Sequence, residues 1–166
     1  MKKKLWIVVI LGAVIFGMYA WVKFNPPLEV STVASSRSYK SVVVGVGNKG
    51  IGDVKIIHVS VNNEEEPSLT KIQVSHALQG FIITEDFKSD ESEKYEFTNI
   101  EDTTIKAGTS PSIQFEKQDN GTATDQDISY GVSVLHNEAI NQVNITYKYF
   151  GITFNETITI TNIPSS

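Results

Sequence analysis

The sequence contains no cysteine among its 166 residues. This absence excludes a disulfide, a thiol nucleophile and a cysteine-ligated zinc site. Small secreted animal domains usually rely on disulfides, so an extracytoplasmic chain without cysteine is more typical of a Gram-positive bacterial surface. Arginine is almost missing as well, with 1 arginine against 13 lysines. We take this ratio as an indication of an AT-rich bacterial genome.

Leucine is also scarce, with 6 leucines against 36 isoleucines and valines together. Side chains branched at Cβ are stiff in helices and pack well on a pleated sheet. After residue 30, no segment of about ten residues keeps the apolar period of roughly 3.6 that a helix requires. The composition therefore predicts strands for most of the chain.

A long apolar run stands at the N-terminus, where the 18 residues 5–22 carry no charge. As a helix this run is about 27 Å long, close to the thickness of the hydrocarbon core of a bilayer. Lysines before the run favour a cytoplasmic N-terminus, and tryptophans near its ends favour the membrane interface. We predict a signal-anchor transmembrane helix in residues 1–23 of a single-pass membrane protein, with the C-terminal domain extracytoplasmic. The anchor residues are Lys2, Lys3, Lys4, Trp6 and Trp21, and the lipid bilayer is the expected partner of residues 5–22.

A cleaved signal peptide is the alternative for this segment. The apolar region of a signal peptide is usually shorter, and Trp21-Val22-Lys23 is a poor cleavage context. Small residues with cleavage spacing occur at Thr32-Val33-Ala34, well beyond the apolar run. Because Pro26 and Pro27 end the helix, we assign residues 24–38 to a linker, with a first edge strand after Leu28 as the alternative.

Basic residues and catalytic motifs are few in the rest of the chain. From residue 24 onward there are 10 basic and 19 acidic residues, a net charge of −9. Such a domain does not attract nucleic acid or anionic lipid over long distances. The G-x-S-x-G and S-x-x-K elements of serine nucleophiles are also missing, so we predict no catalytic residues.

The clearest strand signal is the segment from Gln142 to Thr161. Apolar and polar residues alternate on both sides of Phe150-Gly151. Two runs of period 2 around a glycine predict an antiparallel hairpin with one buried and one wet face. Glu156 is the one charge in the buried phase, and we expect it at a strand edge or a bulge.

Shorter alternating runs fill the rest of the outer domain. After Ile56 the apolar phase slips by one residue, which predicts a bulge or burial on both faces. Roughly nine or ten short strands separated by turns predict an all-β domain, an antiparallel β-sandwich over residues 39–163. Besides the last hairpin and the stretch around Ile56, the predicted strands are residues 42–46, 70–75, 80–84, 95–98, 103–106, 112–116 and 128–136.

The stretch VVVGVGNKGIGDVKIIHVSVNN, with its strand, N-x-G turn and second strand, is similar to the opening of immunoglobulin-like modules. With the N-terminal anchor, the pattern resembles membrane-anchored bacterial surface proteins that carry an immunoglobulin-like or fibronectin-III-like β-sandwich. The Cys…Trp…Cys core of antibody domains is missing, since both tryptophans lie in the anchor. The resemblance therefore implies architecture alone.

The segment from Gly45 to Gly50 spells G-x-G-x-x-G, the pattern of a dinucleotide-binding loop. That site requires a helix directly afterwards, whereas the residues after Gly52 predict a strand. A Walker loop requires Gly-Lys-Ser/Thr, but Lys49-Gly50 has the reverse order. We interpret Gly45–Gly52 as the tip of the first hairpin of the sandwich.

Metal ligands are widely spaced along the chain. His58, His76 and His136 fall on separate predicted strands, which argues against a metal site built from them. The acidic loop of residues 119–127 offers oxygen ligands for calcium without the spacing of an EF-hand. Calcium is the one cofactor considered, and its candidate ligands are Asp119, Asp125 and Asp127.

The function expected from these features is binding. We predict a non-enzymatic, membrane-anchored extracytoplasmic module for adhesion or envelope assembly, with a protein or a cell-envelope polymer as partner. A calcium-dependent extracellular module is the alternative, suggested by the acidic loops. A hydrolase with a site built from scattered residues is a further alternative, because such a site leaves no motif.

Overall fold

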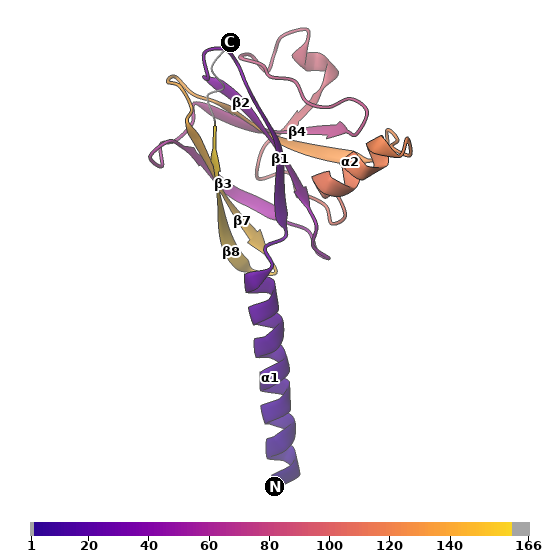
Figure 1. Cartoon of the computed structure of the whole chain (residues 1–166). Coiled ribbons are helices and arrows are strands. Elements are labelled where there is room, and N and C mark those ends of the chain that lie inside the picture. Colours follow the sequence, from indigo (N-terminus) through magenta and orange to yellow (C-terminus); the bar gives the residue numbers. More distant parts are fainter. Residues whose placement is uncertain (1, 161–166) are drawn as a thin grey trace.

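The computed structural model describes residues 2–160, in which a helical stalk carries a sandwich of strands (Figure 1). The side chains of residues 2–5, Val8 and Thr32 are outside the described set. The elements are α1 (Lys2–Phe24), β1 (Leu28–Ser35), β2 (Ser41–Asn48), β3 (Lys55–Val61), β4 (Leu69–His76), the 3-10 helix η1 (Ser92–Lys94), β5 (Glu96–Thr98), α2 (Pro111–Asp119), β6 (Ile128–Leu135), β7 (Gln142–Tyr149) and β8 (Ile152–Thr159).

Within the described residues, eight strands form two antiparallel sheets. The larger sheet has the order β1-β2-β6-β4-β5, and the smaller has the order β3-β7-β8. The prediction of a mostly β, antiparallel, two-sheet domain is therefore confirmed. Alternating residues of both sheets fill the core, because successive side chains of a strand point to opposite faces. Fully buried examples are Val42, Val44, Val132, Val134, Val143, Ile145 and Tyr147.

Three detailed strand predictions are confirmed as well. β7 and β8 form the predicted C-terminal hairpin, with Tyr149 opposite Ile152 next to the turn. Glu156 lies on β8, which is an edge strand of the smaller sheet. The register of β3 against β7 shifts between Ile56 and His58, and Ile57 points outward. The phase slip in the sequence is therefore a β-bulge.

The strand predicted for residues 112–116 is wrong, because this segment belongs to helix α2. Ile113 and Phe115 alternate with polar residues, and that short pattern resembles a strand. Pro111 stands in the first turn of the helix, where its missing N–H costs no hydrogen bond. The strands predicted for residues 80–84 and 103–106 are also wrong: the first has no strand, and the second contributes an isolated bridge between Ile105 and Val54.

The hairpin predicted around Gly45–Gly52 is wrong in its pairing. A strand does follow the glycines, as expected, but β2 pairs with β1 and β6 whereas β3 pairs with β7. The loop therefore crosses from one sheet to the other at the end of the sandwich nearest α1. The segment assigned to a linker contains β1, so the edge-strand alternative is the correct one for Leu28–Ser35.

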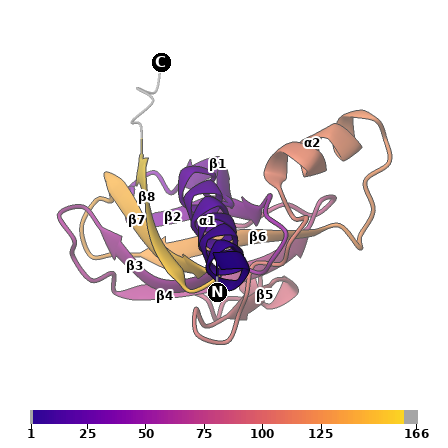
Figure 2. The same ribbon diagram turned by 90° about the horizontal axis from the view of Figure 1, so that it is seen from below.

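Helix α1 extends away from the sandwich and ends at Phe24, where Asn25 and two prolines lead into β1 (Figures 1 and 2). In the part of the chain that is described, no helix combines the length and the apolar character needed to cross a membrane. The predicted transmembrane span is therefore not confirmed.

Candidate functional site

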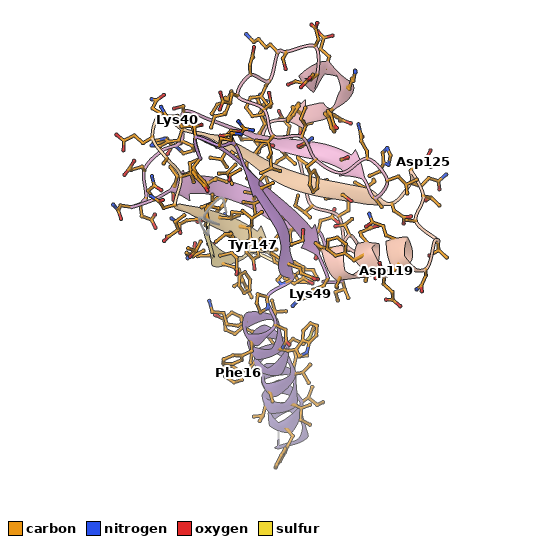
Figure 3. All side chains as sticks on the ribbon, turned by 45° about the horizontal axis from the view of Figure 1, so that its top comes forward. Phe16, Lys40, Lys49, Asp119, Asp125 and Tyr147 are labelled. Carbon is orange, nitrogen blue, oxygen red and sulfur yellow. The ribbon has the colours of Figure 1, made fainter. Side chains whose placement is uncertain are left out.

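The three candidate calcium ligands do not form a site together. The Asp127 carboxylate is already occupied, since it accepts hydrogen bonds from the Thr124 N–H at 2.7 Å and the Thr124 hydroxyl at 2.9 Å, and pairs with Lys117. These donors, Lys117 first, lower the pKa of Asp127 to about 2. Asp119 and Asp125 lie apart in Figure 3. Across residues 2–160, no three histidine, aspartate or glutamate side chains gather in a metal-holding group.

The three histidines lie at separate places in the fold. The His136 ring lies 3.2 Å from the Glu65 carboxylate at one end of the larger sheet. His58 is exposed on β3, and His76 is half-buried at the end of β4. The geometry gives these three side chains no common centre.

The glycine-rich stretch allows the chain to pack closely at two places. A Cβ at Gly47 would lie 2.1 Å from the Thr109 carbonyl oxygen and 2.5 Å from Cδ of Pro111. A Cβ at Gly50 would lie 2.6 Å from the Tyr149 hydroxyl. All three distances are shorter than ordinary contacts, so a side chain at either position requires a neighbour to move, and at Gly47 that neighbour is backbone. The glycines serve backbone contact with neighbouring segments, and strand β3 follows them where a nucleotide site needs a helix.

The outer face of the larger sheet is covered by two connecting segments. Residues 77–84 cross it after β4, and the Ser41 hydroxyl holds them by donating to the Thr84 carbonyl at 2.6 Å. The segment from Thr109 through α2 covers the same face beside β1 and β2. β2 is therefore buried along its whole length, because one face meets the core and the other meets these segments.

A carboxylate on strand β1 fixes the position at which helix α2 begins. Glu29 on β1 accepts hydrogen bonds from the Ser112 N–H at 3.3 Å and the Ser112 hydroxyl at 3.2 Å, and also from the Ser110 hydroxyl. A negative charge at a helix N-terminus satisfies free N–H groups and interacts favourably with the helix dipole. Glu29 therefore sets the position of α2 on the sheet.

A cavity of about 210 Å³ lies between α2, residues 77–83 and the sheet. The Gln114 side chain is 7% exposed, and its amide nitrogen donates to the Ile128 carbonyl at 3.4 Å. Its amide oxygen has no protein partner among the described residues. Ser129 and Tyr130 of β6 also line the cavity. The Tyr130 side chain itself packs in the core between the sheets, where burial raises the pKa of its phenol. Other lining residues include Ala34, Val43, His76, Phe81, Pro111 and Phe115.

The apolar surface of α1 is the second candidate site. Along most of its length, its side chains stand clear of the sandwich (Figure 3). Trp6 and Trp21, the predicted interface residues, are 68% and 57% exposed. Lys2, Lys3 and Lys4 belong to α1, but their side chains lie outside the described set. The exposed apolar residues of α1 are Trp6, Ile7, Val9, Ile10, Leu11, Val14, Ile15, Phe16, Met18, Tyr19, Trp21 and Phe24.

The cavity beside α2 was not predicted from the sequence. Part of its wall comes from two segments, residues 80–84 and 112–116, that the alternation of apolar and polar residues predicted as strands. The residues of these segments that line the cavity are Gly80, Phe81, Ile83, Gln114 and Phe115. Pro111 after Ser110 was the available sign of a helix start. Comparison of the chain with protein-family models, curated proteins and solved structures finds no match.

Proposed function

We propose that this chain is a membrane-attached, non-enzymatic binding module, in which α1 holds the β-sandwich at a lipid bilayer. The observation that carries the proposal is the exposure of apolar side chains around the whole of α1, for example Phe16 at 72% and Leu11 at 60%. A helix that is apolar on every side is normally buried in a large core or in lipid. Among the described apolar side chains of α1, Val22 is the one that the sandwich buries.

Lipid is the environment that best accounts for this surface. Soluble domains rarely leave a continuous apolar patch larger than about 400 Å² in water. The proposal requires that the apolar side chains of α1 enter the apolar part of a bilayer. It does not require that α1 crosses the whole bilayer. The cytoplasmic N-terminus and the extracytoplasmic domain remain sequence predictions based on Lys2, Lys3 and Lys4. Protease protection in intact cells tests them.

The proposal includes an immunoglobulin-like architecture for the sandwich. The order β1-β2-β6-β4 corresponds to the A-B-E-D sheet of a seven-stranded immunoglobulin-like domain, and β3-β7-β8 corresponds to its C-F-G sheet. The additional strand β5 extends the first sheet. This order supports kinship with extracellular binding modules at the level of architecture, and fold alone does not assign a function.

The cavity beside α2 is the proposed partner-binding position. Its walls are mainly apolar, and the buried amide oxygen of Gln114 lacks a donor within the described protein. An unpaired buried acceptor costs free energy, which a ligand recovers when it brings a donor. The expected partner is a protein that inserts an apolar side chain carrying one N–H or O–H group, such as tryptophan or tyrosine.

Fractionation and photo-crosslinking test the two parts of the proposal. The full chain should stay with the membrane fraction through a high-salt wash and leave it in detergent; release by salt alone contradicts attachment through α1. A photo-reactive residue at Phe115, which is 49% exposed at the cavity, should crosslink to one partner band. The same group at Lys40, at the other end of the sandwich (Figure 3), is the control. Equal crosslinking from both positions contradicts the cavity as the binding position.

A further inference from the structure

The end of the sandwich nearest α1 carries exposed apolar side chains on two loops that are far apart in sequence. Ile51, in the loop between β2 and β3, is 80% exposed, and Phe150, at the turn between β7 and β8, is 62% exposed. Together with Ile152 they share one apolar hollow with side chains of α1 between Val14 and Val22. We call Ile51 and Phe150, together with exposed Phe24 at the end of α1, the collar.

The loop that carries Ile51 is held rigidly by the rest of the domain. The Ile51 N–H donates to the Tyr149 hydroxyl at 3.0 Å, and the Lys49 N–H donates to the Pro27 carbonyl at 3.0 Å. The buried Asn48 amide donates to the Gly52 carbonyl at 2.8 Å, and its oxygen accepts from the Gly50 N–H at 2.8 Å. Ile51 is therefore kept outward by the fold, and its exposure does not result from a loose loop.

Phe150 adopts a backbone conformation that is unfavourable for its type. Its φ is +48°, and the following Gly151 has a φ of +77°. In a two-residue hairpin turn with both φ values positive, Asn or Gly is the preferred first residue. Phe150 therefore combines a strained backbone with an exposed aromatic side chain. Strain of this kind is typical of functional positions, and here it is offset if the ring enters an apolar phase.

Charged groups at the same end have the sign that a bilayer surface favours. The Lys23 ammonium lies 5.3 Å from the centre of the Phe154 ring, and Lys49 stands at the junction with α1 in Figure 3. Lys55, the first residue of β3, is paired with Lys148 near the end of β7, and both lie near the collar. The acidic Asp53 in the loop is paired with Lys106 at 2.7 Å. Although the domain is acidic overall, this end presents lysines beside apolar tips.

We propose that the collar is a lipid-contact surface, in which Phe24, Ile51 and Phe150 enter the interfacial layer of the bilayer while the neighbouring lysines meet lipid phosphates. The surface is continuous with the apolar side of α1, and this inference rests on the attachment proposed above. Insertion at two loops besides α1 fixes the orientation of the sandwich. The β3–β4 loop, with its glutamates Glu64, Glu65 and Glu66, then faces away from the membrane.

Single labels test the depth of the collar in the full chain. Because the chain contains no cysteine, one introduced cysteine carries an environment-sensitive fluorophore at one position. The labelled variants are I51C, F150C, F16C and L69C. Phe16 lies on α1, and exposed Leu69 is the first residue of β4, at the end of the sandwich away from α1. Each is mixed with vesicles of phosphatidylcholine, with or without phosphatidylglycerol, and quenched by lipids brominated near the headgroup or deep in the chains.

The emission of the labels at 51 and 150 should shift to shorter wavelength and be quenched by bromines near the headgroup. The label at 16 should be quenched by bromines deep in the chains. The label at 69 should be quenched by neither. If the label at 16 enters lipid while 51 and 150 stay in water, the collar is overturned and attachment through α1 stands. If the label at 16 also stays in water, both proposals fail. Blue-shifted labels at 51 and 150 without lipid quenching overturn lipid contact in favour of a second copy of the chain.

A second variant separates lipid contact from folding. Asn accepts the positive φ at position 150 more readily than Phe, so Phe150→Asn should keep or raise the unfolding midpoint without lipid. In the I51C background it should weaken the shallow quenching at position 51. A variant that stays folded with undiminished quenching at 51 contradicts a role for the Phe150 ring.

Discussion

The hydroxyl of Tyr149 accepts a hydrogen bond of 3.0 Å from the backbone N–H of Ile51. Ile51 lies in the loop between β2 and β3, whereas Tyr149 is the last residue of β7 and is 2% exposed. The bond therefore ties the crossing loop between the sheets to the last hairpin. Gly50 makes the approach possible, because a side chain there would meet the Tyr149 ring. The collar depends on this contact for its shape.

Removing the hydroxyl should loosen the crossing loop. Tyr149→Phe leaves the Ile51 N–H without its protein acceptor, and a lost hydrogen bond of this kind costs about 1 kcal/mol. Urea unfolding should show this loss, and amide exchange at Ile51 should become faster. Tyr95→Phe, on a different loop, is the control. Unchanged exchange at Ile51 contradicts the proposed tie.

Gly47 should tolerate no side chain. In Gly47→Ala the added Cβ meets the Thr109 backbone and the Pro111 ring, neither of which moves without shifting the start of α2. Such overpacking typically costs about 1–3 kcal/mol. Gly52→Ala is the matched control, since its Cβ meets the ring of exposed Phe150 at 2.7 Å, and that ring is free to move. Equal unfolding midpoints for the two variants contradict this explanation of the glycines.

Asp127 should stabilise the fold as a partner of Lys117, with no contribution from calcium. Its pKa is about 2 in the folded chain, below the ordinary value of 3.8. The folded state therefore holds the ionised form more strongly, so its stabilisation is present above about pH 4 and is lost as pH falls toward 2. Acid unfolding should begin at a higher pH in Asp127→Asn than in the unmodified chain.

The controls for this prediction use the other acidic residues of the loop. Asp125→Asn changes an exposed carboxylate and should leave the acid transition in place. Millimolar calcium and a chelator should give the same melting temperature for the unmodified chain. A rise in melting temperature with calcium that Asp125→Asn removes would contradict the absence of a calcium role and restore that alternative.

Filling the cavity beside α2 should block the partner without unfolding the domain. Ala34 lies on edge strand β1 and lines the cavity, so Ala34→Leu extends side-chain volume into it. The expected result is loss of the crosslink from Phe115, with unfolding free energy changed by less than about 1.5 kcal/mol. Lys40→Leu adds a similar apolar side chain away from the cavity and should keep the crosslink. Crosslinking that survives in Ala34→Leu contradicts the cavity as the site.

The parts of the fold that could be predicted from the sequence are the strands in which buried and exposed side chains alternate regularly. Val143, Ile145 and Tyr147 alternate cleanly because one face of β7 meets the core, and the hairpin follows from that pattern. On β2, Gly45 and Gly47 place no side chains on the outer face, yet that face is covered by α2 and residues 77–84. Coverage by distant segments leaves no local period, so the sequence could not reveal the cavity.

The collar illustrates the same limit. Ile51 lies 98 residues from Tyr149, the residue that precedes Phe150, and no local pattern joins the two segments. The sequence placed both Ile51 and Phe150 at predicted turns, but nothing in it indicated that the two turns lie together beside α1. Only the arrangement of the crossing loop and the hairpin beside α1 shows that both point outward at one end.

Flotation of the purified full chain on lipid vesicles tests the central claim most directly. In a density gradient the chain should rise with phosphatidylcholine vesicles at high salt, and Ile10→Asp combined with Phe16→Asp should leave the folded chain at the bottom, because a charge in the apolar phase is expensive. Leu69→Asp, on the domain, should float as the unmodified chain does. A folded, unmodified chain that remains at the bottom of the gradient contradicts membrane attachment through α1.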